Sequence, residues 1–407
     1  MANVSSSNGL EKRPKLRFPG FDEPYVLHRI GDIYAERSER GAADMELLSV
    51  TMNGGVMQRS EIEGKDNSSE DKSNYKVVRK GDMVYNSMRM WQGANGVSPY
   101  DGIVSPAYTV LTAKLPICNE YFAALFKNYK LINEFKKNSQ GMTSDTWNLK
   151  YPQIKTIKVY LPRVTEQEKV ASLLVTLDKR IAAQATLVEQ LKKYKRGVFE
   201  AIFTRKLRLV PKARQSDWTA FKLSDFATRI TRKNNGATDI PLTISAQYGL
   251  IDQRDFFSRV VASSDMSGYY LLRRGEYAYN RSTSNDYPFG SIKRLELYNE
   301  GAVSTLYLCF AIKEDVVLSN FAKWYFESSQ WHRGINEICA EGARNHGLLN
   351  VPTDGFFDTV HILPSDIEEQ AQIAAFLSRI HDKLAKAQEE LDKLIGLRNG
   401  LMQQLFI

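Results

Sequence analysis

The sequence of 407 residues is poor in cysteine and histidine and has no long apolar run. Its three cysteines, Cys118, Cys309 and Cys339, are far apart and odd in number, which argues against a disulfide framework and fits a reducing cytosol. The five histidines have no metal-ligand spacing, and no Cys-x-x-Cys motif occurs. No apolar run could span a bilayer, and the N-terminal residues lack the apolar segment of a secretory signal. We therefore expect a cytoplasmic protein without a metal centre or a membrane partner.

The usual catalytic signatures are also missing. There is no G-x-x-x-x-G-K-[ST] phosphate loop. Residues 286–289, Asp-Tyr-Pro-Phe, partly match the Asp/Asn-Pro-Pro-Tyr loop of amino-methyltransferases, but one proline and a preceding glycine-rich loop are absent. Asp44 followed by Glu63-Gly64-Lys65 has the order of a nuclease motif, although so short a pattern is common. We expect a turn and a charged surface loop at these places, and a chain without catalytic residues or a cofactor of its own.

Positive charge exceeds negative charge along the chain. The net charge is +8. Residues 165–206 contain nine Lys and Arg against five Asp and Glu, whereas residues 365–407 contain five against seven. The remaining segments are therefore also basic. This excess is compatible with a polyanionic partner such as nucleic acid, and almost equally with an ordinary solvated surface.

Two long stretches have the heptad pattern of a coiled coil. Apolar side chains recur in alternating steps of four and three within residues 161–203, and the pattern returns 203 positions later within residues 363–407. About 38 helical residues would form a rod of roughly 57 Å, which could hold two domains apart. The apolar positions are Val170, Leu174, Leu177, Ile181, Val188, Leu191, Val198 and Ile202, then Ile373, Leu377, Ile380, Leu384, Leu391, Leu394, Leu401 and Leu405; Gln184 and Lys195, then Ala387 and Arg398, interrupt them.

Both stretches also begin alike. Each has Leu-Pro followed by a Glu-Gln pair. Thr165 with Glu168, and Ser365 with Glu368, have the spacing of capping boxes and predict the two helix starts. We therefore expect two equivalent long helices, packed as an antiparallel coiled coil.

The segments before the two helices repeat as well, at an offset of about 193 to 202 residues. Residues 45–60 predict a strand, a turn and a strand, residues 75–90 predict a hairpin that turns at Lys80-Gly81-Asp82, and residues 120–138 have helical spacing. The fold class is thus α+β, with two mixed α/β globules arising from a tandem duplication. The expected divisions are an N-terminal tail at 1–20 with residues 1–15 disordered, a globule at 21–160, a helix at 161–207, a linker at 208–216, a globule at 217–362 and a helix at 363–407.

Several loop and helix residues have the chemistry to contact nucleic acid. Arg, Asn, Gln and Ser on loops can read base edges, and Lys can contact phosphate, although turn formation and solvation explain such residues equally well. Tyr85-Asn86 and the matching Tyr279-Asn280 favour a structural role, with a core tyrosine and a turn-capping asparagine. The candidate contacts are Asn86, Ser87, Arg89, Trp91, Gln92, Lys127, Lys130, Lys136, Lys137, Thr143, Ser144, Asn280, Arg281, Ser282, Asn285, Arg344, Asn345 and His346.

Taken together, the opening segment KLRFPGF, the two Leu-Pro…Glu-Gln helices and the duplicated globules resemble the DNA-specificity subunit of type I restriction–modification enzymes, over nearly the whole chain. The resemblance implies that the globules are target recognition domains, each reading one half of a split site in double-stranded DNA, while the helices set the spacer. It implies two docked modification subunits that bring S-adenosylmethionine, and restriction subunits that use ATP. By family position Glu166, Gln167, Glu369 and Gln370 lie where a modification subunit could dock; helix capping is the alternative.

Two other functions stay open at this point. One is a self-contained DNA methyltransferase or nuclease with two DNA-binding halves. The other is a scaffold that dimerises through its helices and does not bind DNA. The duplication and the missing cofactor loops favour the non-catalytic DNA reader.

Overall fold

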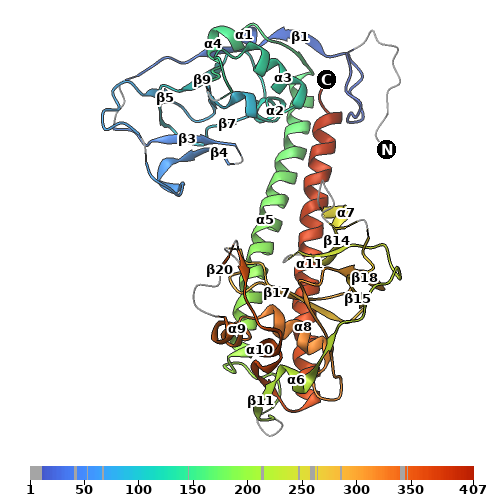
Figure 1. Cartoon of the computed structure of the whole chain (residues 1–407). Helices are drawn as coiled ribbons and strands as arrows, with labels where there is room; N and C mark the ends of the chain where they lie inside the picture. Colours follow the sequence, from blue (N-terminus) through green and yellow to red (C-terminus); the bar gives the residue numbers. More distant parts are fainter. Residues whose placement is uncertain are drawn as a thin grey trace. The chain divides into compact units, whose positions relative to one another are not determined.

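The computed structural model describes residues 12–40, 44–52, 54–66, 68–144, 146–211, 215–245, 248–256, 262–263, 265–284, 287–339, 344–345 and 347–407 (Figure 1). They form two compact units. Unit 1 comprises residues 1–186 and 388–407, and unit 2 comprises residues 187–387. Each unit therefore contains one globule and parts of both long helices.

Unit 1 is a set of small antiparallel sheets with short helices. Its largest sheet has four strands in the order β2-β9-β6-β7. Three two-stranded pairs, β1-β10, β3-β4 and β5-β8, complete it. The strands are β1 Val26–Arg29, β2 Tyr34–Glu36, β3 Leu48–Thr51, β4 Gly55–Gln58, β5 Lys76–Val78, β6 Met83–Asn86, β7 Asn95–Val97, β8 Gly102–Val104, β9 Tyr108–Ala113 and β10 Lys158–Leu161. The helices are α1 Ile30–Ile33, α2 Asn119–Leu125, α3 Tyr129–Asn138 and α4 Tyr151–Ile154.

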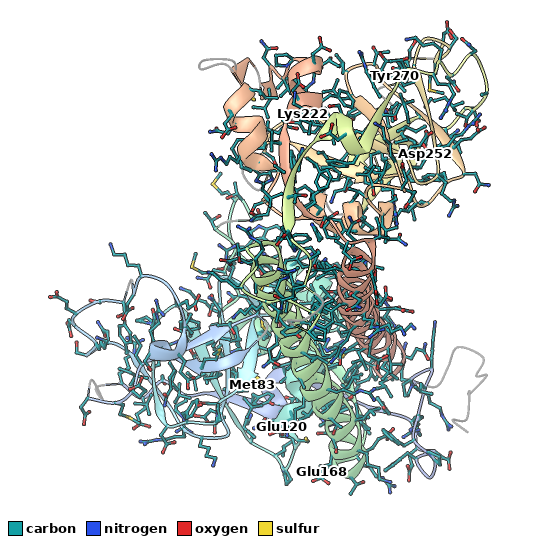
Figure 2. All side chains as sticks on the ribbon, turned by 90° about the horizontal axis from the view of Figure 1, so that it is seen from below. Met83, Glu120, Glu168, Lys222, Asp252 and Tyr270 are labelled. Carbon is teal, nitrogen blue, oxygen red and sulfur yellow. The ribbon has the colours of Figure 1, made fainter. Side chains whose placement is uncertain are left out.

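Unit 2 repeats this topology. Its four-stranded sheet has the order β12-β19-β16-β17, and its two-stranded pairs are β11-β22, β13-β14, β15-β18 and the additional β20-β21. The strands are β11 Trp218–Lys222, β12 Ala227–Ile230, β13 Leu242–Ser245, β14 Gly249–Asp252, β15 Tyr270–Arg273, β16 Tyr277–Asn280, β17 Ser291–Arg294, β18 Glu300–Val303, β19 Leu308–Ile312, β20 Arg344–Asn345, β21 Leu348–Leu349 and β22 Val360–Pro364. The helices are α6 Leu223–Phe226, α7 Gln253–Phe256, α8 Ser319–Glu327, α9 His332–Ile338 and α10 Thr353–Asp358. Figure 2 places Lys222, Asp252 and Tyr270 in this unit and Met83 and Glu120 in unit 1.

The duplication and the hairpin at residues 45–60 are confirmed, but two local predictions are wrong. β5 pairs with β8 while β6 pairs with β7 and β9, so the two strands of the segment 75–90 lie in different sheets. The predicted helix 120–138 is two helices. The break occurs because the Asn128 side chain accepts a hydrogen bond from the Lys130 amide and caps α3.

The long helices are α5, Val164–Phe203, and α11, Ile367–Gln404, and within each unit their segments run antiparallel (Figure 1). In unit 1 Arg180 pairs with Glu390 at 2.9 Å and Arg398 with Asp178 at 2.5 Å. In unit 2 the Lys195 amine lies 3.4 Å from Nδ1 of His381. Lys195 and Arg398 are the two charged residues that interrupt the heptad pattern. Each of them contacts the opposite long helix.

Both predicted capping boxes are wrong. α5 begins before Thr165, and the Arg163 carbonyl accepts the amides of Glu166 and Gln167. α11 begins after Asp366, whose carboxylate accepts the Glu368 amide at 3.0 Å. The helices nevertheless start 203 residues apart, as the repeat predicts.

Each core is completed by one end of a long helix. In unit 1 Met402, Leu405 and Phe406 of the α11 end pack with the globule, and the Phe406 ring lies 5.2 Å from that of Tyr121. In unit 2 Phe203 of α5 takes the equivalent place, 6.1 Å from the ring of Phe321. The ends of α5 and α11 are therefore structural parts of the two globules.

Candidate nucleic-acid interface

In unit 1 the structure brings together two loops that the sequence predicted separately. The Leu149 amide donates to the Ser87 carbonyl at 2.8 Å, which joins residues 86–92 to residues 139–149. The Trp91 and Trp147 rings meet edge to face, with centroids 5.3 Å apart. Lys136 of α3 lies 5.8 Å from the Trp91 ring centroid. We call residues 86–92 and 139–149 the unit 1 loop pair.

Most predicted residues of the unit 1 loop pair and of α3 are exposed. Those with exposed side chains are Arg89, Gln92, Lys130, Lys136, Lys137, Thr143 and Ser144. Trp91 is half-buried, and its indole N–H donates to the Met88 carbonyl. Ser87 was predicted to contact DNA, and this prediction is wrong. The residue is buried, and its hydroxyl lies 2.8 Å from that of Thr109. It is therefore withdrawn from solvent and cannot reach a base.

Unit 2 has a corresponding pair of loops. The Leu349 amide donates to the Arg281 carbonyl, and Thr283 donates both its amide and its hydroxyl to the Gly347 carbonyl. We call residues 280–284 and 344–349 the unit 2 loop pair. Ser282 is exposed. The side chains of Arg344 and Asn345, and all of Asn285, Asp286 and His346, lie outside the described residues.

Arg281 contacts the backbone of its own unit. Its guanidinium donates to the carbonyls of Val351 at 3.2 Å and Leu306 at 3.0 Å. The side chain is half-buried and joins three segments of unit 2. These contacts hold the unit 2 loop pair in place.

The shared Tyr-Asn pair is structural in both units. Tyr85 and Tyr279 are fully buried. Asn86 accepts the Met88 amide and Asn280 accepts the Ser282 amide, each at 3.0 Å. These turns direct the chain out of the central sheet into the loop pairs.

Lys127, predicted to contact phosphate, is half-buried and lies beside Gly93. Its amine donates to the Met52 carbonyl at 3.2 Å and lines a cavity together with Asp178 and Arg398. Burial lowers the pKa of Lys127, and the neighbouring Arg398 lowers it further, against a raising effect of Asp178.

Glu166 and Glu369 are corrected as well, because both carboxylates are buried within their own units. In unit 1 Glu166 accepts two hydrogen bonds from Arg17, each at 2.8 Å, and one from the Tyr25 hydroxyl. In unit 2 Glu369 accepts two from Arg208 at the same distance. It also accepts hydrogen bonds from the Ser216 amide, the Ser216 hydroxyl and the Trp218 indole. These bidentate pairs fasten the segment that leads into each globule, and the carboxylates are not free for another subunit.

Gln167 and Gln370 have the same internal role. Gln167 accepts the Cys118 amide and donates to the Pro162 carbonyl. Gln370 accepts the Leu318 amide and donates to the carbonyls of Val316 and Pro364. The sequence predicted these four residues as docking positions, and the structure makes them clamps between each helix start and its globule.

The clamp also fastens the end of the predicted N-terminal tail to unit 1. Within the described residues 12–20, Arg17 holds Glu166 and the Leu16 amide donates to the Gln404 carbonyl at 3.0 Å. Sequence patterns could not have found Arg17 or Arg208, because each lies more than a hundred residues from its partner.

Residues 36–193 match the family model described as "Type I restriction modification DNA specificity domain". The chain resembles type I specificity subunits. A curated relative from Methanocaldococcus jannaschii, described as a type I restriction enzyme MjaX specificity subunit, is 25% identical over 149 residues. That match covers 35% of this chain and 34% of the relative, so it spans about a third of the relative's length.

Specificity subunits of known structure have the same fold. The type I restriction–modification S subunit from M. genitalium matches with a TM-score of 0.60 and 14% identity, over 97% of this chain and 99% of that one. A chain from a structural study of assembly and conformational transition in the type I R-M system matches with a TM-score of 0.52 and 14% identity, over 95% and 98%. The specificity-subunit fold therefore extends over both units.

Among the described residues, no three His, Cys, Asp or Glu side chains come together as metal ligands. Asp44, Glu63 and Lys65, which have the order of a nuclease motif, are exposed. No helix in the described ranges is long and apolar enough to cross a membrane.

Proposed function

We propose that the chain is the DNA sequence-recognition subunit of a type I restriction–modification complex, acting in the cytoplasm without catalytic activity of its own. The observation that supports this most is the duplication. Two units with the same strand order each expose a loop pair at the same place in the topology, and the specificity-domain match covers the first.

The physical chemistry of DNA reading suits this arrangement. Side chains on exposed loops can reach base edges in the major groove, where each base pair presents its own pattern of donors and acceptors. The same face of the DNA duplex recurs about every 34–36 Å. A second recognition domain adds most to the binding affinity when it contacts that same face. Each unit would read one half of a bipartite site, and α5 and α11 would set the unread spacer.

Chemistry would come from partners. Two modification subunits would supply S-adenosylmethionine and methylate adenine, and restriction subunits would supply ATP-driven cleavage. Because Glu166 and Glu369 are occupied internally, docking would use the exposed faces of the helices.

Methylation sequencing tests the proposal directly. A host would express this chain together with a type I modification subunit, and a control host would express the modification subunit alone. We expect a methylated split motif only in the presence of this chain. Absence of a motif, with assembly of the complex demonstrated, would contradict the proposal. A motif produced by this chain alone would instead establish a self-contained methyltransferase.

Domain exchange then tests the division into two readers. Replacing residues 21–160 by the corresponding globule of another specificity subunit should change one half of the methylated motif. A change in both halves would contradict independent reading.

A further inference from the structure

Unit 1 contains a cavity of about 510 Å³ between β4, β7, α2 and the segments of α5 and α11 that belong to this unit. Its size lies within the range of small-molecule sites. The lining residues that matter are Glu120, Ala124, Lys127, Val175, Asp178 and Arg398. DNA reading by the loop pairs does not use this cavity.

The internal repeat shows what the same place holds in unit 2. Cys118 and Leu318 make the same hydrogen bond to Gln167 and Gln370, which aligns α2 with α8 at an offset of 200. Ala124 therefore corresponds to Trp324. On the long helices the offset of 203 pairs Val175 with Ser378, Asp178 with His381, and Lys195 with Arg398.

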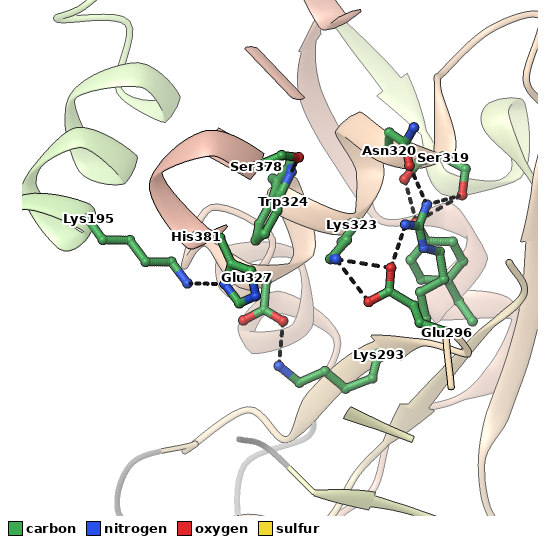
Figure 3. Close-up of polar contacts among 12 residues, drawn as sticks. Lys195, Lys293, Glu296, Ser319, Asn320, Lys323, Trp324, Glu327, Ser378 and His381 are labelled. Carbon is green, nitrogen blue, oxygen red and sulfur yellow. Dashed lines mark hydrogen bonds and ion pairs between the residues drawn. The ribbon is translucent and has the colours of Figure 1, made fainter. Parts of the chain in front are cut away.

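In unit 2 the side chain of Trp324 fills the position and is only 3% exposed (Figure 3). Its indole N–H donates to the Ser378 hydroxyl at 3.1 Å. The ring lies 5.3 Å from His381, and the Lys195 amine is 5.6 Å from its centroid. The unit 1 residues that correspond to these neighbours all line the cavity. Ala124 thus leaves open a space whose counterpart accepts an aromatic ring.

The charges differ in a related way. Lys127 corresponds to Glu327, which in unit 2 pairs with Lys293 at 2.5 Å (Figure 3). In unit 1 this position is a cation, and Arg398 lies in the same wall. Asp178 is engaged by Arg398, and no ion pair of Lys127 occurs among the described residues. Lys80, Lys127 and Arg398 line the cavity as cations, and Glu120 and Asp178 as carboxylates. The lining therefore has an excess of one positive charge, and its position 127 is a cation where unit 2 has a carboxylate.

We propose that the unit 1 cavity binds one small planar heteroaromatic anion, of the size of a nucleoside monophosphate. The ring would occupy the position that Trp324 fills in unit 2, beside the Arg398 guanidinium. The anionic group would pair with Lys127. The proposal concerns a site separate from the DNA-reading loops.

Titration calorimetry of the full chain with adenosine 5′-monophosphate tests the proposal, because this probe combines a planar ring and a phosphate. We expect saturable binding of one molecule per chain. Adenosine lacks the charge and inorganic phosphate lacks the ring, so each should bind at least about tenfold more weakly.

Variants locate the site. Ala124→Trp gives unit 1 the side chain of unit 2 and should abolish binding. Lys127→Gln should weaken binding by about tenfold or more, since it removes a charged hydrogen bond. Lys158→Gln, an equal charge change at an exposed position of β10 outside the cavity, should leave binding unchanged. Thermal unfolding would verify folding, and Ala124→Leu with Lys127→Gln would decide the test if Ala124→Trp did not fold.

Four results would overturn the proposal. They are no saturable binding of the nucleotide, binding that is insensitive to Ala124→Trp and Lys127→Gln, phosphate binding as tight as that of the nucleotide, and variants that change affinity only for double-stranded DNA. The last result would make the cavity part of the DNA surface.

Discussion

The two units share their strand order but not their interiors. Unit 2 contains Trp324 and His361 where unit 1 contains Ala124 and Val159. By contrast, the Glu-Gln clamp at the helix starts has the same partners in kind, with an Arg on each Glu and a backbone amide on each Gln. The topology is thus set by backbone pairing and a few buried polar contacts, while many side-chain combinations can fill the space between.

The clamps give the largest expected difference between the units. Glu369→Gln would leave Arg208 without its charged partner, and breaking a buried pair costs about 3–5 kcal/mol. Glu166→Gln should cost less, because Glu166 lacks contacts equivalent to those of Ser216. Proteolysis of each unit during urea unfolding, with the fragments identified by mass, would measure both. Equal losses would show that the extra hydrogen bonds to Glu369 contribute nothing.

The second largest expected difference between the units is the loss of stability in acid. His361 is buried between the Tyr325 and Thr359 hydroxyls, and burial lowers its pKa from 6.5 to about 4. The unfolded chain therefore binds this proton more readily, and unit 2 should lose up to about 3 kcal/mol as the pH falls from 6.5 to 4. This stability is fully present above pH 6.5. Urea unfolding of unit 2 across this range would measure it.

The variant His361→Val, which places the unit 1 residue in unit 2, is the matched control. It should flatten the pH dependence of unit 2 and leave that of unit 1 unchanged. A pH dependence that survives the substitution would assign the effect to another group.

Substitutions in the two loop pairs should have different effects, one on DNA affinity and the other on the stability of its unit. Arg89 is exposed, so Arg89→Ala should weaken specific DNA binding by about 1–3 kcal/mol if it reads a base. Arg281→Ala should instead destabilise unit 2 by about 1–3 kcal/mol, since it removes the charged hydrogen bonds to the carbonyls of Val351 and Leu306. DNA affinity at fixed salt and unfolding of each unit would be measured for both variants. Loss of DNA affinity with unaltered stability in Arg281→Ala would reverse this assignment.

The smallest expected effect on stability comes from the exposed ion pairs between the long helices. In unit 1 Arg180 and Glu390 pair across the helices with exposed side chains, 67% and 43%. Such pairs contribute less than about 1 kcal/mol, so Arg180→Gln should be nearly neutral. The small loss should vanish in 1 M salt, where the Debye length is about 3 Å. A loss that persists in high salt would point to packing of the Arg180 side chain.

The sequence predicted what is periodic or repeated. The heptad positions mark both helices, and the repeat anticipates the shared strand order even where the individual strands are short. It failed where distant residues decide the outcome. Arg17 and Arg208 turn the Glu-Gln pairs inward, and Ser87 is buried by Thr109, which no local pattern reveals. The repeat did carry a signal of the cavity and its filled counterpart, since Ala124 stands where the second half has Trp324.

The ends of the long helices have a consequence for synthesis on the ribosome. Unit 2 is continuous in sequence, whereas unit 1 needs Met402, Leu405 and Phe406 to complete its core. At about 5–20 residues per second, the globule made first waits roughly 10–40 s for its last hydrophobic side chains. During translation its apolar surface is therefore uncovered, and unit 2 can close while unit 1 still awaits its final helix turns. The half of the molecule that emerges first is the half that matures last.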